Sequence, residues 1–221
     1  MTGVIFDVDG VILDVRESYH YAIKYTAEEF VGREIPIEEV RRIKFSRGIN
    51  NDWLATLEVI REYGKNADLK DVIERFNSIY LTLRDKERLL LTPELFRSLK
   101  RQGIPLGVLT GRPAEDLEYA FSRFGLWEFF DFVVHEDTIP QRELRKPHPY
   151  ALHFCVEGLN VERAIYVGDS LADWHMVKYY RKLYEKPVFY IHVGEALEAQ
   201  GVKPSSPDSL PQDLQEVLRS L

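Results

Sequence analysis

Val4-Ile-Phe-Asp-Val-Asp-Gly10 is a short apolar run that ends in two acids and a glycine. The apolar residues predict a buried strand. Because side chains alternate along a strand, Asp7 and Asp9 would then leave its carboxyl end on the same face. A hard cation would be a functional reason for two like charges this close, because it neutralises their repulsion and carboxylate oxygens are ligands that Mg²⁺ prefers. A lone Asp-x-Asp also fits a solvated strand end before a turn, so other segments must decide between the two interpretations.

Similar apolar runs recur between helical patterns along most of the chain, at residues 3–6, 104–109, 130–135, 164–167 and 187–193. This alternation predicts an α/β fold, and the continuous apolar character of the runs favours a parallel sheet covered on both faces. One helix is predicted at residues 94–102, directly after Thr92 and Pro93, and another at residues 113–124, directly before Gly125. We therefore predict a doubly wound α/β core.

One long stretch, residues 16–91, interrupts the alternation. Its apolar side chains recur only at helical spacing, as in the sets Tyr19, Ile23, Thr26 and Phe30; Leu54, Leu57 and Ile60; and Val72, Phe76, Ile79 and Leu83. We expect no strand there, and we expect loops at residues 32–36 and 46–52. The predicted organisation is a Rossmann-like core of residues 1–15 and 92–221 with an inserted all-helical domain at 16–91.

A second pair of acids lies in Tyr166-Val-Gly-Asp-Ser-Leu-Ala-Asp173. The strand at 164–167 delivers Asp169 to its carboxyl end, and Asp173 follows one helical turn later on the same side. Both carboxylates could therefore face a single ion. Because open α/β sheets place their sites at the carboxyl ends of the strands, this pair and the pair at Asp7 and Asp9 are expected to meet.

Two further segments could bind phosphate at the same edge of the sheet. Thr110 and Gly111 end the strand at 104–109 just before a helix, where a hydroxyl, a backbone amide and a helix N-terminus can cradle an anion. Lys146 stands before Pro147, which fixes the local chain and could aim the ammonium into a cleft. Each segment alone also has a plainer explanation. Thr110 and Gly111 could form only a turn before a helix, and Lys146 could be an ordinary surface lysine.

Composition limits the remaining possibilities. A net charge of −7 and an isoelectric point near 5.5 argue against a protein that mainly binds nucleic acid. No basic leader and no apolar run near the roughly 20 residues of a membrane span are present. The single cysteine, Cys155, cannot form an internal disulfide and is expected to fill the core. We expect a cytoplasmic monomer or homodimer without nucleic-acid or membrane partners.

The four segments, in their order along the chain, resemble the four motifs of the haloacid dehalogenase superfamily. The helical insert resembles the cap domain of its branch of phosphoglycolate phosphatases and β-phosphoglucomutases. The resemblance implies that Asp7 is the nucleophile that forms an aspartyl-phosphate, and that Asp9 is the general acid and base. It also implies that Thr110 and the Gly111 amide hold the phosphoryl oxygens while Lys146 offsets their charge.

In this family Mg²⁺ is held by the carboxylate at the Asp7 position, the main-chain carbonyl at the Asp9 position and the carboxylate at the Asp169 position. Asp173 would be a further ligand or would act through a neighbour. The acid at Asp9 disfavours dehalogenation, because the dehalogenase branch lacks it. His148 and His175 are expected to be structural or solvent-facing, since the necessary roles are already filled.

The cap resemblance suggests where substrate selectivity arises. Arg47, Gly48 and Asn50 lie in a polar loop between two predicted helices, and an arginine there suits a carboxylate or phosphate. The same loop could simply start a helix, with Asn51 or Asp52 as N-cap and Arg47 in solvent. Weaker candidates of the same kind are Tyr19 and His20.

The expected function is that of a magnesium-dependent phosphatase that hydrolyses a small phosphorylated metabolite through an aspartyl-phosphate. Two alternatives stay open. A phosphomutase of similar architecture would use the same acids, and a relative without catalysis would only bind a phosphorylated ligand.

Overall fold

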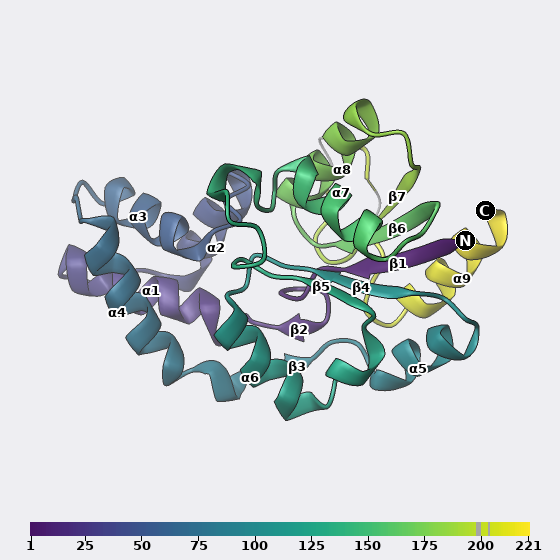
Figure 1. Cartoon of the computed structure of the whole chain (residues 1–221). Coiled ribbons are helices and arrows are strands. Elements are labelled where there is room, and N and C mark those ends of the chain that lie inside the picture. The colour runs from purple at the N-terminus through teal and green to yellow at the C-terminus, as the bar shows by residue number, and fades with distance from the viewer. Residues whose placement is uncertain (198–199, 203) are drawn as a thin grey trace. The chain divides into compact units, whose positions relative to one another are not determined.

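The structure is a computed structural model that describes residues 1–197, 200–202 and 204–221 (Figure 1). It divides into two compact units. Residues 1–13 and 89–221 form one, here called the core unit, and residues 14–88 form the other, here called the helical unit. The sequence analysis placed its domain boundaries after residues 15 and 91, and that assignment stays a prediction.

A five-stranded parallel sheet forms the centre of the core unit. Its strands are β1 (Thr2–Phe6), β4 (Leu106–Leu109), β5 (Phe132–Val134), β6 (Arg163–Gly168) and β7 (Val188–His192), in the order β5-β4-β1-β6-β7. Each strand lies within one of the predicted apolar runs or extends it by one residue at one or both ends. The chain first builds the sheet outward on one side of β1 and then returns to the other side. The carboxyl ends of β4, β1 and β6 therefore meet at a topological switch point.

Helices cover both faces of this sheet, which confirms the predicted doubly wound α/β fold (Figure 1). The helices of the core unit are α5 (Pro93–Arg101), α6 (Ala114–Phe124), α7 (Pro149–Gly158), α8 (Leu171–Leu183) and α9 (Leu210–Ser220), with short 3₁₀ turns at Trp127–Phe129 and Arg142–Leu144. Ile5 on β1 packs in a cluster with residues of α7 and α8. Its neighbour Phe6 points to the other face, where it meets Phe96 of α5 edge to face at 5.3 Å between ring centroids.

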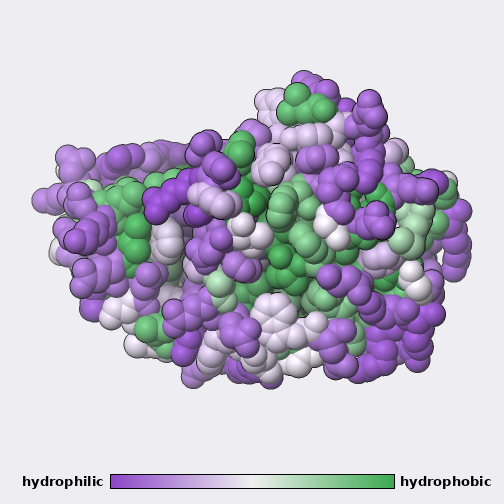
Figure 2. All heavy atoms as spheres, viewed as in Figure 1, coloured by the Kyte–Doolittle hydropathy of each residue, from purple (hydrophilic) through white to green (hydrophobic). Residues whose placement is uncertain are grey.

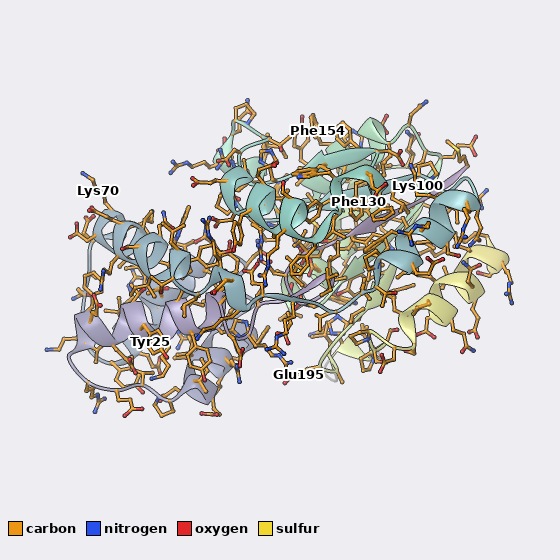
Figure 3. All side chains as sticks on the ribbon, turned by 90° about the horizontal axis from the view of Figure 1, so that it is seen from below. Tyr25, Lys70, Lys100, Phe130, Phe154 and Glu195 are labelled. Atoms are coloured by element: carbon orange, nitrogen blue, oxygen red, sulfur yellow. The ribbon has the colours of Figure 1, made fainter. Side chains whose placement is uncertain are left out.

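The face under α5 and α6 has an aromatic core. Phe130, labelled in Figure 3, lies 6.3 Å from Phe6, 5.2 Å from Phe96 and 5.5 Å from Phe121, measured between ring centroids. On the other face Cys155 of α7 is completely buried, as expected, and burial raises the pKa of its thiol well above its usual range. Two well-filled faces hold β1, and with it the residues that follow its carboxyl end, in one position.

Figure 2 shows mainly hydrophilic residues over the face in view, with smaller hydrophobic areas among them. Scattered apolar residues are normal on protein surfaces. Among the helices in the described ranges, none combines the length and the apolar character that a membrane crossing demands.

The helical unit contains α1 (Tyr19–Val31), α2 (Ile37–Ser46), α3 (Asp52–Glu62) and α4 (Leu69–Leu81), followed by a 3₁₀ turn at Arg84–Lys86. Tyr19 of α1 stacks on Tyr80 of α4 at 4.3 Å between ring centroids. Leu54 does not share the buried face that its helical spacing with Leu57 and Ile60 suggests: it is 48% exposed, whereas Leu57 and Ile60 are buried.

The expectation of no strand between residues 16 and 91 is also corrected. Two short strands, β2 (Leu13–Asp14) and β3 (Arg88–Leu89), pair where the chain leaves the core unit and returns to it. The Leu90 amide donates to the Ile12 carbonyl beside them at 2.8 Å. A two-residue strand exists only through its partner far along the chain, so local periodicity carries no signal for it.

Candidate active site

Asp7 directly follows β1 and is almost completely buried. Its backbone amide donates to the Val167 carbonyl of β6 at 2.9 Å, so the sheet hydrogen bonds continue one residue past the strand. Oδ1 of its carboxylate accepts from the Val8 amide at 2.7 Å, and Oδ2 lies 2.6 Å from Nζ of Lys146. The side chain is therefore fixed from both sides.

Asp173 lies in the first turn of α8 and is completely buried. With Ser170 it forms a reciprocal capping box: Ser170 Oγ accepts from the Asp173 amide at 3.1 Å, and the Ser170 amide donates to Asp173 Oδ2 at 3.2 Å. Ser170 Oγ also donates to Asp173 Oδ2 at 2.8 Å. Oδ1 accepts from the Tyr166 hydroxyl at 2.7 Å and lies 2.9 Å from Lys146 Nζ. Both oxygens of Asp173 are therefore engaged by protein groups.

Lys146 places one buried ammonium between these two carboxylates. Burial lowers the pKa of this ammonium, but Asp173 and Asp7 more than reverse the effect, so it stays charged. Burial also raises the pKa of Asp7 to about 8, although Lys146 opposes this. The pKa of Asp173 is lowered, because Lys146, Tyr166 and Ser170 outweigh its burial. A single cation cannot neutralise both acids, and the protonated form is therefore favoured at Asp7 rather than at Asp173.

Asp169 completes a cluster of three acids at the end of β6. Carboxylate oxygens of Asp7, Asp169 and Asp173 all lie within 4.8 Å of one another. Gly10 makes room for this arrangement, because a Cβ there would lie only 1.9 Å from Oδ2 of Asp169, and its φ of +77° also favours glycine. When all three carboxylates are ionised, the one ammonium leaves a net charge of −2 among these groups. Such a set of hard oxygen donors fits a divalent cation such as Mg²⁺.

Thr110 and Asp9 are linked by a residue to which sequence reasoning assigned no role. The Thr110 amide continues the sheet by donating to the Val134 carbonyl at 2.9 Å, and its Oγ1 accepts from the Arg112 amide at 3.1 Å. The Arg112 guanidinium donates to Oδ1 of Asp9 through Nε at 3.0 Å and through Nη2 at 2.5 Å. Gly111 lies between Thr110 and Arg112 and is half-buried.

Tyr166 is the other contributor that the sequence analysis missed. A buried tyrosine almost always needs a partner for its hydroxyl, and an acid seven residues later, after a strand end, was a candidate partner.

For Arg112 the available signal was its place two residues after Thr110. A charged residue so close to a strand end of the sheet must find a counter-charge when it is buried.

The candidates in the helical unit have local partners. Arg47 forms ion pairs with Glu58 and, at 2.6 Å, with Glu62, both on α3. Asn51 is the N-cap of α3, since its side chain accepts from the Leu54 amide at 3.0 Å. Gly48 has a φ of +60° and Asn50 is half-buried. These contacts agree with the structural interpretation of the loop, and a role in substrate binding for Arg47, Gly48 and Asn50 stays a prediction.

The histidines take structural positions. His148 is the N-cap of α7 and its Nδ1 accepts from the Tyr150 amide at 3.1 Å. His175 is half-buried beside the Trp174 ring. In the helical unit, His20 accepts from Nε of Arg41 at 3.3 Å, and burial together with Lys44 and Arg41 lowers its pKa to about 3.

The order of the motifs, the switch point and the buried cluster of acids agree with one known family. A family model of haloacid dehalogenase-like hydrolases matches residues 4–180. The chain belongs to this family. The resemblance inferred from the four motifs is thereby confirmed, and the protein is an enzyme of the hydrolase type that this family comprises.

Individual relatives of this haloacid dehalogenase-like hydrolase are distant. It is 30% identical over 184 residues to an imidazoleglycerol-phosphate dehydratase of Phytophthora nicotianae, a match that covers 77% of this chain but only 40% of that protein. It is 28% identical over 186 residues to a phosphoglycolate phosphatase of Cereibacter sphaeroides, covering 78% of each chain. Among solved structures, phosphatase Tt82 from Thermococcus thioreducens superimposes with a TM-score of 0.70 at 28% identity, covering 96% of this chain and 99% of that one.

Proposed function

We propose that this protein is a magnesium-dependent phosphatase that hydrolyses a small phosphorylated metabolite through an aspartyl-phosphate. The observation that carries the proposal is the position of Asp7, a buried carboxylate at the switch point with Lys146 at 2.6 Å and two further acids around it. The named activities of the Cereibacter and Thermococcus relatives support the same reaction class.

In the proposed reaction, a carboxylate oxygen of Asp7 attacks phosphorus while the bond from phosphorus to the ester oxygen breaks. Asp9 gives its proton to the leaving oxygen. Asp9 then takes a proton from water as that water attacks phosphorus, and the bond to Asp7 breaks to release phosphate. Thr110 and the Gly111 amide would hold the phosphoryl oxygens, and Lys146 would offset their charge throughout.

The carboxylates of Asp7 and Asp169, with the main-chain carbonyl of Asp9, would hold Mg²⁺. When bound, the ion would neutralise charge on the phosphoryl group and the nucleophile. Asp173 would act indirectly, because both of its oxygens already accept hydrogen bonds from Tyr166 and Ser170. Its role would be to hold Lys146 and the start of α8 in place.

Phosphate release from a panel of phosphorylated metabolites tests the proposal. The panel should include 2-phosphoglycolate, after the Cereibacter relative, together with sugar monophosphates and p-nitrophenyl phosphate. We expect turnover with Mg²⁺, none in excess chelator, and recovery when Mg²⁺ is restored. Ca²⁺ should substitute poorly, because it prefers longer bonds and more ligands. Full activity in excess chelator would contradict the metal assignment.

The two alternatives predict other results in the same assay. A phosphomutase would transfer phosphate between positions of a sugar phosphate and would need a bisphosphate for turnover. A protein that only binds phosphorylated ligands would release no phosphate from any compound. A small-molecule substrate, the cytoplasmic location and the monomeric or homodimeric state stay predictions of this proposal.

Asp9→Asn should lower turnover by at least about 100-fold, the usual scale of general acid–base catalysis. Asparagine keeps the size of the side chain but cannot carry the proton. The measurement is kcat with the best metabolite, alongside the pH–rate profile. An unchanged profile in this variant would remove Asp9 from the acid–base role.

Arg47→Ala tests the prediction that the helical unit contributes to selectivity. We expect kcat/KM for a metabolite with a second anionic group to fall by an amount equivalent to about 1.5–3 kcal/mol, the value of a charge-assisted hydrogen bond. The value for p-nitrophenyl phosphate should not change, because this compound lacks the remote group. Arg61→Ala is the matched control, since Arg61 also pairs with Glu58. Equal effects on both substrates would show that Arg47 only stabilises α3.

A further inference from the structure

Arg112 is a fully buried arginine whose side chain exposes none of its surface, whereas the Asp9 side chain that it contacts is 28% exposed. The two residues lie 103 positions apart in the sequence, and both Nε and Nη2 donate to the same oxygen, Oδ1, of Asp9. A buried guanidinium needs such a partner, because an isolated charge in the interior is strongly unfavourable. The contact is therefore part of the fold of the core unit.

This one-sided contact distinguishes the two oxygens of Asp9. Oδ1 accepts two N–H groups, from Nε and Nη2, and both hold this one oxygen against the guanidinium. No residue in the described part of the chain donates to Oδ2 of Asp9. Since Asp9 is partly exposed and Arg112 is not, the oxygen that can meet substrate or water is Oδ2.

Arg112 also acts on the proposed phosphate cradle. Its backbone amide donates to Oγ1 of Thr110 at 3.1 Å, so one residue contacts both the hydroxyl at the end of β4 and the carboxylate after β1. The distance between a phosphoryl group held at Thr110 and a proton held on Asp9 would then depend on Arg112. Positioning of reacting groups on this scale governs rate, and a misplacement of about 1 Å can cost roughly 100-fold.

We propose that Arg112 is a positioning residue that holds Asp9 by Oδ1, so that Oδ2 exchanges the proton with the leaving group and with water. The inference rests on the proposed phosphatase function. In the first step the proton on Oδ2 passes to the ester oxygen as its bond to phosphorus breaks. In the second step Oδ2 takes a proton from the attacking water, and Arg112 keeps its own protons throughout.

A double-mutant cycle on the full chain tests this inference. Arg112→Met, Asp9→Asn and the double variant are assayed with two substrates, p-nitrophenyl phosphate and an alkyl monophosphate such as glycerol phosphate. We expect Arg112→Met to lower kcat/KM, which reports the step that forms the aspartyl-phosphate, by about 100-fold for the alkyl ester. For p-nitrophenyl phosphate, whose leaving group needs little protonation, the loss of kcat/KM should be only a few-fold.

The decisive measurement is made in the Asp9→Asn background. There we expect Arg112→Met to cause no further loss, because groups that act as a unit are not additive. A full additional loss would show that Arg112 acts on the substrate or on the fold and would overturn the inference. Equal losses of kcat/KM for the two esters in the single variant would overturn it as well.

Controls separate this inference from folding and from the proposed function. Arg163→Met removes another core-unit arginine, whose Nη1 donates to the Leu221 carbonyl, and should leave kcat unchanged for both esters. If Arg112→Met does not fold by circular dichroism, Arg112→Lys takes its place in the cycle. Lysine keeps the charge but lacks the paired Nε and Nη2 donors, so the same non-additive loss is expected. A wild-type protein that releases no phosphate would refute the proposed function, whereas an active wild type with additive losses refutes only the role of Arg112.

Discussion

Asp7→Asn is expected to abolish turnover while leaving the fold intact. An amide oxygen cannot attack phosphorus as a carboxylate does, and loss of a nucleophile costs on the order of 10⁶-fold in well-studied hydrolases. The fold should survive, because Asn keeps the shape of the side chain and Lys146 retains Asp173 at 2.9 Å. Phosphate release and circular dichroism, measured on the same preparation, check both parts.

A matched control comes from the opposite edge of the sheet. Asp131 precedes β5 and accepts from the Leu106 amide at 2.9 Å, so Asp131→Asn changes an aspartate of the same core unit far along the strands from the carboxyl ends. This variant should keep its turnover. Near wild-type activity in Asp7→Asn would refute the aspartyl-phosphate mechanism.

Lys146→Met should weaken both the enzyme and the fold. The variant leaves the buried carboxylates of Asp7 and Asp173 without their shared ammonium, and removing one partner of a buried ion pair typically costs about 3–5 kcal/mol. Turnover of p-nitrophenyl phosphate should fall on the order of 10²–10³-fold, because a preorganised charge at the phosphoryl group is lost.

The free energy of unfolding from urea titrations, with and without Mg²⁺, checks this prediction. A divalent cation should restore stability more in Lys146→Met than in the wild type, since it supplies the missing positive charge. Lys100→Met is the control. Lys100, labelled in Figure 3, pairs with Asp131 at the surface, and such pairs contribute about 1 kcal/mol or less. Equal destabilisation by the two variants would show that the buried ion pairs of Lys146 contribute no more to the free energy of unfolding than the surface pair of Lys100.

The central part of the fold could be predicted from sequence because its signals are local. Apolar runs bounded by turns mark the strands of a buried parallel sheet, and acids directly after such runs must lie at its carboxyl edge. Asp7 and Asp169 follow β1 and β6 in this way, and the structure brings their carboxylates together. This prediction needed only the topology of the sheet and no knowledge of the contacts between side chains.

Other features depend on partners that sequence spacing does not reveal. The pairing of Arg112 with Asp9 joins positions far apart in the chain, and so does the pairing of β2 with β3. Arg47 pairs with Glu58 and Glu62 of α3. These pairs form because the loop folds back onto α3, and the spacing of the residues in the sequence does not show this. The exposure of Leu54 depends on the rotation of α3, which tertiary packing sets.

The pairing of β2 with β3 also affects the order in which the chain can fold. Val4 of β1 must find Leu106 of β4 across roughly 100 residues, and closing a long loop costs conformational entropy that grows with the logarithm of its length. If residues 14–88 fold first, Leu13 and Leu89 are already side by side, and the loop left to close is about a quarter as long. The closure cost then falls by about 1 kcal/mol. Early folding of the insert would therefore speed assembly of the parallel sheet, whose long-range pairings are intrinsically slow to form.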